Sequence, residues 1–220
     1  MNKRTVFIVL GLLILAAITA FVVWDRHQTS QLQNTTLSQI DGATRTLRAA
    51  MAPAANTATH AQTIAASAEQ VDQDLTALRA AGTSRILLLA AGADGYLVTA
   101  RELLRRQAVM LDLRGKISSE IIAFRDHLLA GNRRAANWTT EAVRLKNRLE
   151  QDFREYQRTV EAHTKIADSF PDARKPLAGL VPDSQLIAAS EIAATSDAAQ
   201  AAAKALAAEV EAVRSIAAPR

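Results

Sequence analysis

The sequence predicts an all-α protein in which a single N-terminal transmembrane helix is followed by an elongated up-down-up-down four-helix bundle. Three observations lead to this fold class. Residues 5–24 form an uncharged apolar run. Apolar residues recur at steps of three or four along most of the remaining chain, which is the period of an amphipathic helix. The composition is rich in alanine, with only 4% aromatic residues and 8 glycines, and this balance favours helices over sheets.

The apolar run, TVFIVLGLLILAAITAFVVW, has the length of a membrane-spanning helix. At the helical rise it covers about 30 Å, the thickness of the hydrocarbon core of a bilayer. A Lys-Arg pair precedes the run, so the positive-inside rule places residues 1–4 in the cytoplasm. Residues 25–220 are then the periplasmic domain of a single-pass protein of the inner membrane. A cleaved signal peptide is the alternative, but Trp24 at the last apolar position favours a retained anchor.

The first helix beyond the anchor is expected at residues 28–81. Apolar or small residues recur in it at steps of three or four, which is typical of a helix packed along a partner. Pro53 does not change the phase of this stripe, and this favours a kink in one helix. A tight reversal at residues 52–56 is the alternative. The stripe consists of Leu37, Ile40, Thr44, Leu47, Met51, Ala54, Ala58, Ala61, Ile64, Ala68, Val71, Leu75 and Leu78.

The second helix is expected at residues 84–130. A Gly-Thr-Ser sequence at residues 82–84 combines a helix stop with side chains that cap a new helix. The apolar stripe then extends from Ile86 to Leu128. Its first segment, RILLLAAG, also fits a short buried strand, although the chain offers no partner strand for it.

Two further helices are expected at residues 133–169 and 184–218, on either side of a loop rich in proline. The apolar face of the third helix contains aromatic and large aliphatic residues, whereas the face of the fourth is mostly alanine. Because alanine buries little area, the fourth helix is expected to be held least firmly. Short connections make the helices alternate in direction, so the C-terminus returns to the end of the bundle that carries the anchor.

The middle of the chain reads IIAFRDHLLAGNRRAANWTTEAVRLKNRLEQDFREYQRTV and contains a loose pattern of an arginine, a leucine pair and a glycine at Arg125, Leu128, Leu129 and Gly131. With one apolar helix leading into a long four-helix bundle, the chain resembles the periplasmic sensor domains of methyl-accepting chemoreceptors and of some sensor histidine kinases. The resemblance covers roughly residues 25–218. It implies a role in signal transduction such as chemotaxis. No second apolar span and no output domain follow, so it implies a sensor-like domain without its own output.

The sequence contains no pattern that indicates catalysis. Its four histidines lie far apart without metal-ligand spacing, and cysteine is absent. Neither a glycine-rich phosphate loop nor a nucleophile elbow is present. We therefore expect no enzyme activity, no cofactor and no bound metal. The formal net charge of +4 includes the pair before the anchor, and the nearly neutral remainder argues against nucleic-acid binding.

One charge feature indicates a ligand. Between Arg85 and Arg148 there are twelve basic and six acidic residues. Within this segment Arg101 and Arg105 lie one helical turn apart, and guanidinium groups bind carboxylate or phosphate in bidentate fashion. Tyr96 is close in sequence, and we expect these three residues to form the binding site for a small anionic ligand. The alternative is that the arginines keep the flank of an apolar stripe hydrated and that Tyr96 fills the core.

Two functions are compatible with this architecture. In the first, the bundle is a sensory or ligand-binding module that forms a homo-oligomer or acts on a signalling partner in the membrane, and its helices shift when the ligand binds. In the second, it is a structural or assembly protein of the cell envelope, a helical spacer or scaffold that binds another protein along an exposed helix face.

Overall fold

The computed structural model describes residues 3–52, 57–130 and 137–217, and the side chains of residues 3–14 lie outside this description. Within these ranges the chain is almost entirely helical, which confirms the all-α class. The segment RILLLAAG forms no strand, since a 3₁₀ turn at Thr83–Ile86 leads directly into a helix. The helices are α1 (Lys3–Met51), α2 (Thr57–Ala80), α3 (Leu87–Ala130), α4 (Trp138–Arg174) and α5 (Ala189–Ala217).

The structure contradicts the predicted transmembrane helix at residues 5–24. Among the residues that the structure describes, no helix has a stretch that is both long enough and apolar enough to cross a bilayer. Residues 5–14 of the predicted span lie outside the described side chains. The cytoplasmic position of residues 1–4, the single-pass topology and the periplasmic location at the inner membrane depend on that helix and are corrected with it.

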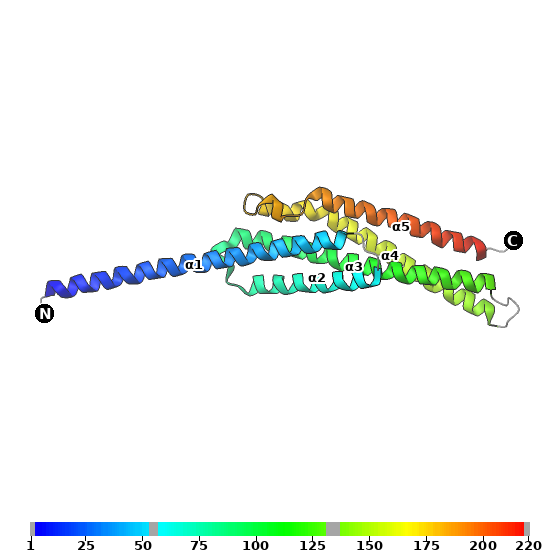
Figure 1. Cartoon of the computed structure of the whole chain (residues 1–220), viewed down its shortest axis with the longest axis horizontal. Helices are drawn as coiled ribbons and strands as arrows, with labels where there is room; N and C mark the ends of the chain where they lie inside the picture. Colours follow the sequence, from blue (N-terminus) through cyan, green and yellow to red (C-terminus); the bar gives the residue numbers. More distant parts are fainter. Residues whose placement is uncertain (1–2, 53–56, 131–136, 218–220) are drawn as a thin grey trace.

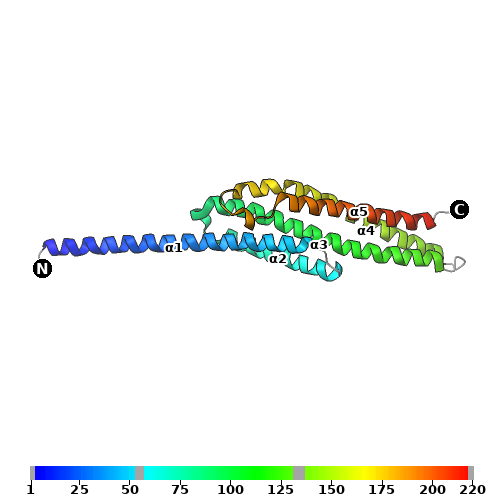
Figure 2. The ribbon, with the colours of Figure 1, turned by 45° about the horizontal axis from the view of Figure 1, so that its top comes forward.

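The helix predicted at residues 28–81 is two helices in the structure. α1 and α2 lie side by side and run in opposite directions (Figures 1 and 2). The chain therefore reverses between Met51 and Thr57, and the prediction of one kinked helix is wrong. Pro53 itself lies outside the described residues. The constant phase of the stripe has a physical reason, because both helices bury their apolar faces in the same cluster with α3.

The additional reversal changes the direction of every later helix. α3 runs parallel to α1, α4 runs antiparallel to it, and α5 is parallel again (Figure 1). As a result, α5 ends at the opposite end of the molecule from the beginning of α1 (Figure 2). This contradicts the predicted four-helix order, in which the C-terminus returns beside the first helix.

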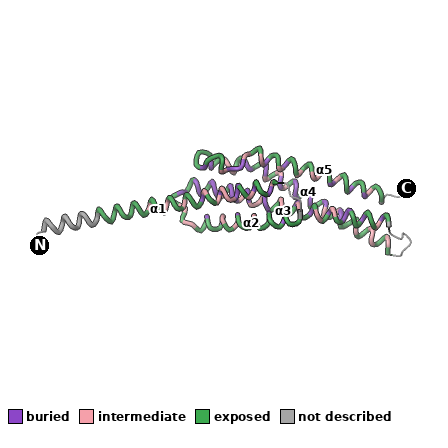
Figure 3. The backbone as a smooth tube through the Cα atoms, in the orientation of Figure 1, coloured by how far each residue is buried: buried purple, intermediate pink, exposed green. Residues whose placement is uncertain are grey.

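Buried residues recur along α3 (Figure 3), and their side chains belong to two clusters. The first cluster joins α1, α2 and the first half of α3 to the end of α4 and the segment before α5, and it includes the fully buried Leu97 and Leu104. The second cluster joins the remainder of α3 to the first half of α4 and the second half of α5, and it includes Phe124 and Leu149. Since α1 and α2 do not reach the second cluster, three helices form it.

The segment between α4 and α5 belongs to the core. Leu177, Leu186 and Ile187 are buried in the first cluster. Gly92 of α3 permits the close approach of this segment, because a Cβ atom at that position would lie 2.7 Å from Cδ2 of Leu177. The connection therefore fixes where α5 begins relative to α1 and α3.

Candidate functional site

Arg101 and Arg105 extend from α3 toward α2, and carboxylates of the chain itself pair with both. Arg101 donates hydrogen bonds to Asp72 of α2 and, at 3.1 Å, to Glu102. One Nη of Arg105 lies 3.5 Å from Asp72 Oδ2, and the other lies 3.6 Å from Glu102 Oε1. The hydrogen bond from Arg101 is the main reason that the pKa of Asp72 lies below its ordinary value. These ion pairs join α3 to α2.

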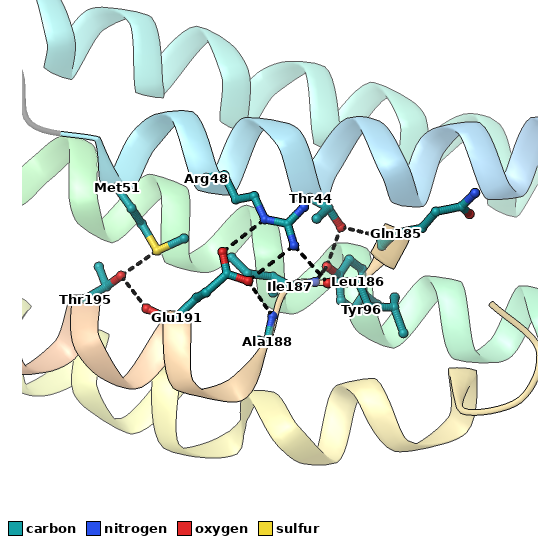
Figure 4. A network of polar contacts seen from close by, with 10 residues as sticks. All are labelled: Thr44, Arg48, Met51, Tyr96, Gln185, Leu186, Ile187, Ala188, Glu191 and Thr195. Atoms are coloured by element: carbon teal, nitrogen blue, oxygen red, sulfur yellow. Dashed lines mark hydrogen bonds and ion pairs between the residues drawn. The ribbon is translucent and has the colours of Figure 1, made fainter. Parts of the chain in front are cut away.

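Tyr96 belongs to the core and not to that ion-pair cluster. Its hydroxyl shares a 2.6 Å hydrogen bond with Thr44 of α1 and accepts another from the backbone N–H of Ile187 at 3.2 Å (Figure 4). Its ring packs edge-on against Phe170, with the ring centroids 5.2 Å apart. Burial raises the pKa of Tyr96, since these hydrogen bonds offset the desolvation only in part. The structure thus does not bring Tyr96 together with the two arginines.

We expect Arg101→Ala to lower the melting temperature by about 2–4 °C and Arg105→Ala to leave it nearly unchanged. The side chain of Arg101 is only 19% exposed, so its removal deletes packed methylene groups as well as the partner of Asp72. Arg105 is 45% exposed, and exposed ion pairs contribute little to stability. Thermal melts followed by circular dichroism measure both. Unchanged melting in both variants, with loss of binding to a small anion, would instead support the predicted anion site.

A second charged junction connects the end of α1 to the beginning of α5 (Figure 4). Nε and Nη2 of Arg48 donate to the two carboxylate oxygens of Glu191 at 3.0 and 3.2 Å. Nη2 also donates to the carbonyl oxygen of Leu186 at 3.2 Å. Oε1 of Glu191 accepts a hydrogen bond from the backbone N–H of Ala188 at 3.0 Å, so this carboxylate also caps α5. The bond from Arg48, and next the bond from Ala188, keep the pKa of Glu191 below its ordinary value.

A cleft lies beside this junction, at the boundary between the two hydrophobic clusters. α1 ends there while α3, α4 and α5 continue, and residues from all four helices line a volume of about 570 Å³. Its walls are mostly apolar. Met51, Met110 and Leu111 come from α1 and α3, and α5 contributes mainly alanines such as Ala194 and Ala198.

Among the described residues, the lining of the cleft carries one uncompensated positive charge. Arg48 and Glu191 pair with each other, whereas Arg114 of α3 is exposed and forms no ion pair with any residue that the structure describes. Tyr156 of α4 is buried and lines the same cleft. Burial raises the pKa of Tyr156, and the positive charge of Arg114 lowers it in part, which indicates that the guanidinium lies near the phenol.

The prediction from sequence missed Arg114, although this residue lies within the basic segment at residues 85–148. α1 leaves part of α3 uncovered because the chain reverses after Met51. The apolar stripe at residues 37–78 did not predict this reversal. One signal was present: Gln107, Leu111 and Arg114 share a helix face at spacings of four and three residues, so two polar side chains interrupt an apolar face.

No protein-family model matches the chain, and no curated protein or solved structure is detectably similar to it.

Proposed function

We propose that this protein is a helical, sensor-like ligand-binding module and that its cleft binds a small amphipathic carboxylate. The observation that carries the proposal is a mostly apolar cleft of about 570 Å³ that contains Arg114, a guanidinium with no ion-pair partner among the described residues. Small-molecule sites in proteins have volumes of about 300–1,000 Å³, mostly apolar walls and a few polar groups that orient the ligand. An acid with an apolar body matches both features.

The charges in the cleft favour a monoanion. Arg114 can bind a carboxylate in bidentate fashion, and such charge-assisted hydrogen bonds are stronger than neutral ones. The Arg48–Glu191 pair in the lining is neutral overall, so a second negative charge on the ligand would find no second unpaired cation among the described residues of the lining. The walls are mostly apolar, so the described lining offers few polar groups to solvate a highly charged ligand.

The position of the cleft supports a sensory role. A bound molecule would contact the end of α1 and the first half of α5 as well as α3 and α4. α5 presents alanines to the cleft, and side chains this small bury little area, so α5 is the helix that a ligand moves most easily. Small shifts of packed helices are a common way of transmitting binding to a signalling partner or to a second copy of the chain.

We expect octanoate to bind the wild-type chain and Arg114→Gln to weaken this binding at least tenfold. The substitution leaves a shorter, uncharged polar side chain and removes a charge-assisted contact, which contributes about 1.5–3 kcal/mol. Calorimetric titration at pH 7 measures the affinity. 1-Octanol has the same apolar chain without the charge and should bind far more weakly.

Arg106→Gln is the matched control, because Arg106 is exposed on the same helix and does not line the cleft. It should leave the affinity for octanoate unchanged. Equal losses in Arg106→Gln and Arg114→Gln would show a general charge effect and contradict the site. If octanoate fails to bind, the alternative function as a structural scaffold gains support.

A further inference from the structure

His163 lies in the interior between the helices that line the cleft, and one of its ring nitrogens makes no hydrogen bond to any described residue. This residue of α4 is only 1% exposed, and its Nδ1 atom is buried without a hydrogen-bond partner among the residues that the structure describes. Most buried polar atoms of native proteins are paired, because an unpaired one lowers stability. Burial lowers the pKa of His163 to about 4, so the imidazole is neutral at pH 7.

Only a few side chains separate His163 from the cleft. A cavity of about 10 Å³ touches the imidazole, and Met51, Gln107 and Thr195 line both this cavity and the cleft. The hydroxyl of Thr195 donates to the sulfur of Met51 (Figure 4). Methionine is unbranched and adapts its rotamer readily, so a ligand can displace this side chain and join the cavity to the cleft.

We infer that His163 is a specificity-determining residue of the cleft and that the ligand is a carboxylic acid with a hydroxyl group at the end remote from its carboxylate. This inference rests on the proposed function, in which Arg114 binds the carboxylate. A neutral imidazole has one donor and one acceptor nitrogen. A hydroxyl group both donates and accepts, so it pairs with Nδ1 in either tautomer, whereas a carbonyl group pairs with only one.

The spacing along α3 sets the length of this ligand. Gln107 lines both the cleft and the cavity of His163, and Arg114 lies two helical turns further along the same face. Seven residues of helix correspond to about 10 Å. An extended 8-hydroxyoctanoate places its carboxylate and hydroxyl at about this separation, and its methylene chain lies along the methionines and alanines of the cleft.

Calorimetric titration of the full chain at pH 7 with octanoate and 8-hydroxyoctanoate tests the inference. The wild type should bind the hydroxy acid about fivefold more tightly, since one neutral hydrogen bond contributes about 1 kcal/mol. His163→Leu should bind both acids equally, with its affinity for octanoate retained. His163→Asn places an amide near the position of Nδ1 and should keep part of the preference, and it provides the comparison if His163→Leu folds poorly.

The outcomes separate this inference from the proposed function. Equal affinities in the wild type, or a preference that persists in His163→Leu, would overturn the role of His163. In both cases binding of octanoate that depends on Arg114 would leave the proposed function intact. Absence of binding by either acid would overturn both.

Discussion

Replacing Tyr96 with alanine should lower the free energy of unfolding by about 3–5 kcal/mol. Tyr96 is fully buried where α1, α3 and the segment before α5 meet, and its ring packs against Phe170. The substitution would leave a cavity the size of a ring and would also leave the backbone N–H of Ile187 without its hydrogen-bond acceptor. Thr44 would keep one bond, to the carbonyl oxygen of Gln185 at 2.8 Å.

Urea unfolding of Tyr96→Ala measures this loss, and two variants serve as its controls. Tyr96→Phe removes only the hydroxyl and should cost about 1–2 kcal/mol, because it still leaves the Ile187 N–H unpaired. Leu88→Ala on the same helix should be nearly neutral, since Leu88 is 75% exposed. A Tyr96→Ala variant with wild-type stability but reduced affinity for an anion would restore Tyr96 as the ligand-binding residue that the sequence predicts.

The helical period identified the faces that α3, α4 and α5 bury, because large aliphatic and aromatic residues recur along them at regular spacing. Leu97 and Leu104 of α3, Leu149 of α4 and Val210 of α5 belong to these apolar faces and are buried in the structure. Burial of such side chains is the dominant favourable contribution to folding, so their pattern constrains which face points inward. The pattern does not specify which helix covers that face.

The direction of the chain after Met51 could not be predicted for this reason. A helix that kinks and a helix that turns back both keep an apolar stripe in phase, provided that both segments pack on the same partner. A proline is compatible with either outcome. Because the chain turns back after Met51, the bundle predicted with four helices has five in the described part of the chain. The beginning of α1 and the end of α5 therefore lie at opposite ends of the molecule (Figure 2).

The candidate site was harder to predict, because the sequence does not show which arginines form ion pairs with carboxylates of the same chain. Arg101 and Arg105 are adjacent on one face, but Asp72 of α2 lies opposite them, and only the fold shows this. Arg114 instead lines the cleft at the end of α1 and has no such partner among the described residues. Whether a guanidinium is free for a ligand thus depends on where neighbouring helices end.

Acidification from pH 7 to pH 4 should remove about 3 kcal/mol of stability through His163. The ordinary pKa of histidine is 6.5, and burial lowers that of His163 to about 4 in the folded protein. Between these values the unfolded chain binds a proton that the folded chain excludes. The contribution of His163 to the free energy of unfolding is therefore complete above about pH 6.5. It falls as the pH decreases from 6.5 to 4 and changes little below pH 4.

The comparison of wild type with His163→Leu isolates this effect, because other groups titrate in the same range. Burial raises the pKa of Glu120, Asp152 raises it further, and Arg148 offsets these effects only in part. A carboxyl group with a raised pKa favours the folded state on acidification, so Glu120 opposes His163 in the pH dependence of the free energy of unfolding.

Urea unfolding at a series of pH values gives the free energies of unfolding of wild type and His163→Leu. The difference between the two should change by about 3 kcal/mol from pH 7 to pH 4. A constant difference would mean that His163 is protonated as readily in the folded chain as in water. The imidazole would then be accessible to solvent, which contradicts its burial beneath the cleft.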